Sequence, residues 1–192
     1  MLVEGLDRSF PGISRIRDAR LRDHVKAQWR YVSERNPIHT DVERIPLHPT
    51  LPLETYGGLA AHIRAMAALS ETLVPAYAKE WGIPMDLDRF LAAAYAHDSA
   101  KVIEFVMRDG KLEGTPGFDH AVEGARVARE VGFPEEVAHM IEVHTYIGKL
   151  RIARTKEAQL FQFLDPMCLP VFPEAGKGAV ERHLEANGWS IR

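Results

Sequence analysis

The stretch FLAAAYAHDSAK, residues 90–101, places a histidine and an aspartate directly after the longest unbroken apolar run of the chain. That run, Phe90 to Ala96, has seven residues and is far too short for a membrane-spanning helix, which needs about 20. Asp86 can cap a helix over this run, because its carboxylate can accept hydrogen bonds from the first free N–H groups. We therefore expect a buried helix that delivers His97 and Asp98 to the interior of the protein.

Apolar residues recur with a helical period along most of the remaining sequence. These patterns predict further helices over residues 13–34, 55–81, 101–107, 119–131, 134–144, 155–168 and 174–187. Pro75 is expected to kink or restart the second of these helices, and the prolines between residues 37 and 52 indicate an irregular loop. Residues 108–118 are expected to form another loop. Because no segment shows a convincing strand pattern, we expect an all-α fold, a single helical bundle over residues 1–192.

The overall composition excludes several classes of protein. The chain has 24 basic and 27 acidic residues and a net charge of −3, which argues against a binder of nucleic-acid polymers. The single cysteine, Cys168, rules out an internal disulfide framework and suits a reducing, cytoplasmic compartment. The first ten residues lack the apolar core of a secretory signal, and we expect no membrane partner.

Several polar side chains fall where the helical pattern calls for apolar ones. One such histidine alone is more often a hydrogen-bonded core residue than a metal ligand, but here the candidates, with the adjacent pair at 97–98 taken as one, each fall on a different predicted helix or helix start. In chain order they are His62, His97 with Asp98, His120, His144 and Asp165. Helices in a bundle can aim such residues at one interior point, and imidazole and carboxylate ligands suit Fe, Mn, Co, Ni or Zn. A carboxylate next to a histidine, as in the pair at 97–98, can bridge two ions.

The order H…HD…H…H…D, with the pair inside AAAYAHDSAK, resembles the HD superfamily of metal-dependent phosphohydrolases between about residues 56 and 168. The resemblance implies an HD-type helical domain with a metal site in the bundle core, flanked by an N-terminal helix and Pro-rich loop over residues 1–55 and a C-terminal helix over about 174–187. It implies that the first ion is held by His62, His97, Asp98 and Asp165. It assigns the second ion to His120 and His144, with Asp98 bridging. This set matches the binuclear branch, so two divalent transition-metal ions are implied, Fe or Mn ahead of Co, Ni or Zn.

Basic residues near these positions suggest where a substrate would bind. In the family's HD-x-x-K pattern the lysine, here Lys101, points at a substrate phosphate, so Asp98 and Lys101 are the expected catalytic residues. Lys149, Arg151 and Arg154 follow His144 closely and could hold further phosphate oxygens.

The leading interpretation is a hydrolase that cleaves a phosphomonoester or phosphodiester with a metal-bridging hydroxide. Its partner would be a small phosphorylated substrate, and nucleotides are among the candidates. One alternative has the same ligands in a di-iron oxygenase of the inositol or phosphonate type, and a second is a non-catalytic, metal-bearing module that senses a ligand.

Without metals, we expect Asp98 and Asp165 to repel each other, so that one of them takes up a proton. The sequence does not indicate the oligomeric state.

Overall fold

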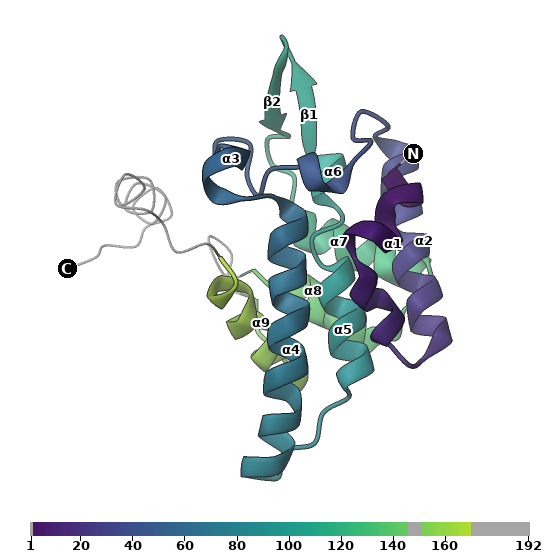
Figure 1. Cartoon of the computed structure of the whole chain (residues 1–192), viewed down its shortest axis with the longest axis vertical. Helices are drawn as coiled ribbons and strands as arrows, with labels where there is room; N and C mark the ends of the chain where they lie inside the picture. Colours follow the sequence, from purple (N-terminus) through teal and green to yellow (C-terminus); the bar gives the residue numbers. More distant parts are fainter. Residues whose placement is uncertain (1, 146–150, 170–192) are drawn as a thin grey trace, which may run out of the picture.

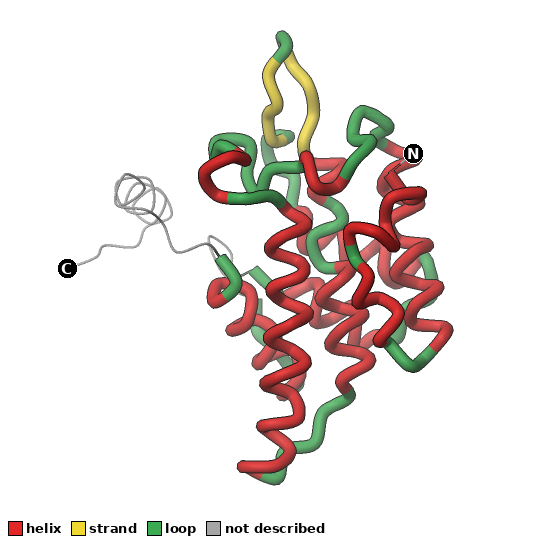
Figure 2. The backbone as a smooth tube through the Cα atoms, in the orientation of Figure 1, coloured by secondary structure: helices red, strands yellow, loops and turns green. Residues whose placement is uncertain are grey.

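A computed structural model of the chain describes residues 2–145 and 151–169. Helices make up most of this part and pack side by side, so the predicted helical fold is confirmed (Figures 1 and 2). No helix among these residues is both long enough and apolar enough to span a membrane. The helix expected over residues 174–187 lies outside the described residues.

The elements follow one another along the chain with short connections. The α-helices are α1 (Leu6–Ser9), α2 (Ala19–Arg35), α3 (Leu53–Tyr56), α4 (Leu59–Trp81), α5 (Leu87–Ala96), α6 (Lys101–Glu104), α7 (His120–Glu130), α8 (Glu135–Val143) and α9 (Lys156–Met167). The strands are β1 (Phe105–Arg108) and β2 (Lys111–Gly114), and 3₁₀ turns cover Leu2–Gly5, Pro11–Arg15 and Val42–Arg44.

Helix α5 lies at the centre of the bundle and packs against α2, α4 and α8. Every residue from Phe90 to Ala96 is buried, as the unbroken apolar run predicted. The alanines of this helix leave room for its neighbours to approach, because interhelical distances depend on the side chains at the contact. The end of α5, and with it His97, therefore lies in the interior.

Hydrogen bonds from α2 hold the end of α5 in place. Trp29 Nε1 donates to the carbonyl of Tyr95 at 2.7 Å, and Gln28 Nε2 donates to the carbonyl of Ala96 at 3.1 Å. Gln28 Nε2 also lies 2.8 Å from Ser99 Oγ, beyond the pair at 97–98. These bonds satisfy carbonyls that the end of a helix leaves free, and they fix the segment that carries His97 and Asp98.

A β-hairpin replaces part of the helix and loop expected over residues 101–118. Helix α6 ends at Glu104, and β1 pairs antiparallel with β2 in a register that joins Phe105 to Gly114. Asp109 and Gly110 form the two-residue turn, with φ values of 50° and 76°. An Asp-Gly pair is a strong hairpin signal because both residues tolerate positive φ. The hairpin projects away from the helices in Figure 1 and supplies the only strands of the described residues.

Two other helix predictions also need correction. The helix expected over residues 13–34 begins later, at Ala19, because the carboxylate of Asp18 accepts hydrogen bonds from the main-chain N–H groups of Arg20 and Leu21. The helix expected from residue 55 is divided at Gly57, whose φ is 72°, into α3 and α4. Helix α4 then continues through Pro75 without restarting.

Candidate metal centre

The four histidines and two aspartates singled out in the sequence come together in the bundle core. They lie on α4 (His62), in the turn after α5 (His97 and Asp98), at the first residue of α7 (His120), directly after α8 (His144) and on α9 (Asp165). They form three overlapping groups, in each of which one ligand atom per residue lies within 4.8 Å of the others. These groups are His62–His97–Asp98, His97–His144–Asp165 and Asp98–His120–His144, and each could hold a metal ion.

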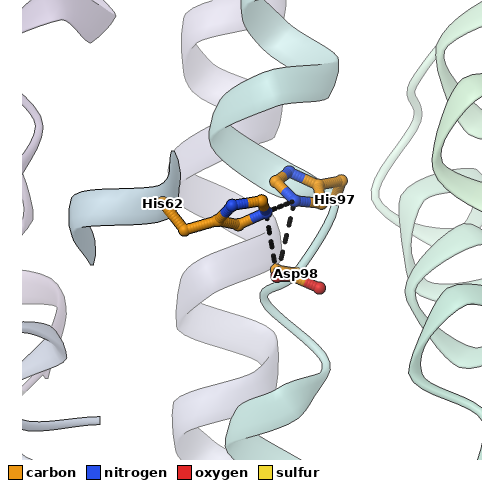
Figure 3. Close-up of side chains that lie close together, drawn as sticks. All are labelled: His62, His97 and Asp98. Atoms are coloured by element: carbon orange, nitrogen blue, oxygen red, sulfur yellow. Dashed lines mark hydrogen bonds and ion pairs between the residues drawn. The ribbon is translucent and has the colours of Figure 1, made fainter. Parts of the chain in front are cut away.

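One half of the cluster gathers around the Nε2 atoms of His62 and His97, which lie 3.1 Å apart. His62 Nε2 also lies 3.1 Å from Asp165 Oδ1. Asp98 Oδ2 lies 3.7 Å from His62 Nε2 and 3.4 Å from His97 Nε2 (Figure 3). Imidazole nitrogens and carboxylate oxygens thus face one small volume from three directions.

The other half of the cluster gathers around the second oxygen of Asp98. The Nε2 atoms of His120 and His144 each lie 3.4 Å from Asp98 Oδ1. This oxygen is buried and has no hydrogen-bond partner among the described residues. A buried carboxylate oxygen without a donor is costly, so this position suits a cation that also faces both Nε2 atoms. The two oxygens of Asp98 therefore face two different pairs of histidines.

Main-chain carbonyls orient three of the four imidazole rings. The Nδ1–H groups of His62, His97 and His144 donate to carbonyl oxygens at 3.3, 2.8 and 2.6 Å. The acceptors belong to Cys168, Ala94 and Ile141, respectively. A proton held on Nδ1 leaves the Nε2 lone pair free for a metal ion, so these bonds select the tautomer that can bind one.

The groups around Asp98 and Asp165 argue against the expectation that one of these two carboxyls takes up a proton when no metal is present. Burial alone would raise the pKa of Asp98, but the ammonium of Lys101 and the neighbouring His97 outweigh it and hold this pKa well below its ordinary value. Burial is likewise outweighed at Asp165, where the contact with His62 and the charge of His144 lower the pKa. The pKa values of both carboxyls are therefore lowered, opposite to the rise expected from burial and like charge.

The pKa values of two histidines shift in opposite directions. Burial lowers the pKa of His97 despite its contact with Asp98. At His144 the effect of burial is outweighed by the neighbouring carboxylates of Asp98 and Asp165, so its pKa is raised. A metal ion would therefore have to displace a proton from His144 more often than from His97.

The basic residues considered for substrate binding lie in different surroundings. Lys101 Nζ lies 2.8 Å from Asp98 Oδ2 and 3.4 Å from the carbonyl of Leu47, at the edge of the cluster. Arg151 pairs instead with Asp119 and donates to the carbonyl of Glu142. The main-chain N–H of Arg154 donates to His139 Nε2 at 3.0 Å. These contacts of Arg151 and Arg154 lie outside the six-residue cluster, and Lys149 lies outside the described residues.

The sequence interpretation missed Glu104, whose Oε2 atom lies 3.1 Å from His120 Nδ1. A weak signal was present, because Glu104 follows Lys101 by three residues and so shares its face of the short helix α6. Nothing in the sequence pattern, however, connects this helix with the start of α7.

A family model described as HD domain matches residues 59–167. The match spans more than half of the chain and includes all six side chains of the cluster. No curated protein and no solved structure shows significant similarity to the chain.

Proposed function

Because the chain belongs to the HD-domain family, we propose that it is a metal-dependent phosphohydrolase that cleaves a small phosphomonoester or phosphodiester. Nucleotides are candidate substrates. The observation that carries the proposal is the position of Asp98, whose two oxygens face separate pairs of imidazole Nε2 atoms while one of them lacks a hydrogen-bond donor. This arrangement supports two ions that share one carboxylate.

The distances in the cluster support the ligand assignment that the family resemblance implies. We propose that one ion is held by His62, His97, Asp98 and Asp165, and that the second is held by Asp98, His120 and His144. Mixed nitrogen and oxygen ligands suit Fe or Mn, and also Co, Ni or Zn. When bound, two such ions would act as Lewis acids on a phosphoryl group and would lower the pKa of water.

The residues of the chain have distinct tasks in this proposal. Asp98 holds the two halves of the site together, because each of its oxygens faces one half. The three main-chain carbonyls that bind Nδ1–H groups keep the imidazole rings oriented before any ion arrives. Lys101 provides a positive charge at the edge of the cluster, where it would stabilise negative charge that develops on phosphoryl oxygens.

The Pro-rich loop lies beside this edge. The carbonyl of Leu47 lies 3.4 Å from Lys101 Nζ, and the carbonyl of Ile45 accepts a hydrogen bond from the N–H of Leu59 at the start of α4. The loop is thus anchored to the helix that carries His62. We propose that it borders the substrate and contributes to specificity.

A panel of phosphate esters tests the proposal, with protein prepared anaerobically and then loaded with Mn²⁺ or Fe²⁺. Phosphate release should occur equally under nitrogen and in air. Asp98→Asn should abolish it, whereas the matched variant Asp109→Asn, at the exposed hairpin turn, should behave as the wild type. Strict oxygen dependence would move the chain to the oxygenase alternative. Absence of turnover on every ester, with metal bound, would favour the non-catalytic module.

A further inference from the structure

His120 is the most exposed of the four clustered histidines, and it begins a helix instead of following one. Its side chain is 21% exposed, against 2% or less for the other three. It is the first residue of α7, whereas His97 and His144 directly follow α5 and α8. The orientation of the His120 ring therefore needs a different support.

The support of His97 and His144 comes from the preceding helical turn. Each Nδ1–H donates to the carbonyl three residues earlier, that of Ala94 or that of Ile141. Three residues before His120 stands Gly117, which has a φ of 75° and lies in a turn before α7. No preceding turn of α7 exists to supply such a carbonyl.

The carboxylate of Glu104 occupies the corresponding position at His120. Glu104 Oε2 lies 3.1 Å from His120 Nδ1, while Nε2 of the same ring lies 3.4 Å from Asp98 Oδ1. The two carboxylates thus contact the two different nitrogens of one ring. Glu104 faces the nitrogen that does not point to the centre of the cluster.

The backbone around Glu104 is held by several segments. The carbonyl of Glu104 accepts hydrogen bonds from both N–H and Oγ1 of Thr115, each at 2.9 Å. Asn36 Nδ2 donates to the carbonyls of Val102 and Phe105 at 2.8 and 2.9 Å. The carboxylate of Glu104 therefore extends from a fixed point, and its side chain is only 18% exposed.

We propose that Glu104 is a positioning residue for the second metal ion. Glu104 Oε2 is buried and has no hydrogen-bond partner among the described residues, and at 3.1 Å from His120 Nδ1 it would accept the Nδ1–H after a small ring rotation and so select the tautomer whose Nε2 lone pair faces Asp98 Oδ1. A carboxylate in this position also makes the imidazole a stronger ligand. The inference depends on the two-ion site of the proposed function and adds a residue to it.

Titration of the metal-free, full-length protein with Zn²⁺ tests this role by calorimetry or equilibrium dialysis. The wild type should bind two ions. Glu104→Ala should weaken the second ion roughly 10- to 100-fold and leave the first unchanged, as is typical for loss of a group that orients a metal ligand. Glu104→Gln keeps a hydrogen-bond acceptor and should weaken binding of the second ion less than Glu104→Ala does. The matched variant Glu113→Gln, exposed on β2, should bind both ions as tightly as the wild type. Thermal melting of the metal-free variants checks that they fold.

Nitrogen-15 spectra of the histidine rings in the Zn²⁺-loaded wild type give a second readout that needs no variant. They should show the His120 proton on Nδ1. A second ion that binds Glu104→Ala as tightly as the wild type would overturn the role of Glu104 alone, whereas a proton on Nε2 would also exclude His120 as a ligand of the second ion. A wild type that binds fewer than two ions would overturn the two-ion site as well.

Discussion

The ammonium of Lys101 lies 2.8 Å from Oδ2 of Asp98, one helical turn away along the chain. Lys101 therefore acts as the counter-ion of the carboxylate on which both halves of the cluster converge. An ion at Asp98 would supply the positive charge that Lys101 supplies in this structure. The ammonium would then be available to a phosphoryl oxygen, which reconciles its ion pair with a role in substrate binding.

Lys101→Ala should keep both metal ions, because an ammonium is not a ligand, but should lose turnover. A loss of about 10²- to 10³-fold in kcat is the scale for one preorganised donor to a transition state. Lys101→Arg should recover only part of it, because a planar guanidinium does not reproduce a compact charge. Steady-state kinetics and elemental analysis measure the two effects. Lys111→Ala, at an exposed position of β2, is the control, and a loss of metal from Lys101→Ala would contradict the assignment.

Asp98→Ala should lose both ions, whereas His144→Ala should lose mainly the second. The reason is that the oxygens of Asp98 face both pairs of histidines, while His144 Nε2 lies near Oδ1. Elemental analysis after reconstitution and dialysis gives the number of ions per chain. Asp109→Ala, at the exposed hairpin turn, controls for the loss of one carboxylate. Full metal content in Asp98→Ala would show that this residue does not bridge.

The stability of the metal-free protein should depend on the charge of Asp98. The pKa of Asp98 is lowered in the folded chain, so its contribution is complete above the unfolded pKa of about 3.9 and is lost as the pH falls through the folded value. Asp98→Asn leaves Lys101 without its buried counter-ion and should lower the free energy of unfolding by roughly 3 kcal/mol near neutral pH.

Urea unfolding of both proteins in EDTA, from about pH 6 to about pH 3, measures this difference. The gap between wild type and Asp98→Asn should narrow below about pH 4, where the Asp98 carboxylate of the unfolded chain begins to take up a proton while that of the folded chain does not. A gap that stays constant over this range would indicate that the substitution acts through packing and not through charge.

Local chemistry explains why three of the helix starts were predictable. The carboxylates of Asp86 and Asp119 and the hydroxyl of Thr155 each accept a hydrogen bond from a main-chain N–H of the helix they precede. These bonds span only a few residues, so a short sequence pattern contains them. The convergence of six polar residues was predictable for another reason, because each one interrupted an apolar helix face or stood at its end.

Sequence reasoning missed two kinds of feature. One depends on competition between a helix and a hairpin over the same residues, and the other on contact between segments that are separate in the sequence. The Asp109-Gly110 turn carried a hairpin signal, but the largely apolar segment 102–107 also matched a helical pattern, and pairing between β1 and β2 decided the outcome. The contact of Glu104 with His120 arises because two separate elements, α6 and α7, meet in space. No local sequence pattern encodes a contact between two separate elements, so this contact could be found only in the structure.

Removal of the metals should lower the melting temperature, because the ions bind the folded chain and hold together residues from five segments. At a free-ion concentration about 100 times the dissociation constant, binding stabilises the folded state by about 2.7 kcal/mol. For a chain of this length, that corresponds to a decrease of roughly 5–10 °C on treatment with EDTA. Calorimetric melting of loaded and EDTA-treated protein measures it. Asp98→Ala should melt at the same temperature with and without EDTA, because it holds no ions to remove. A wild type whose melting temperature does not respond to EDTA would place the ions outside this buried cluster.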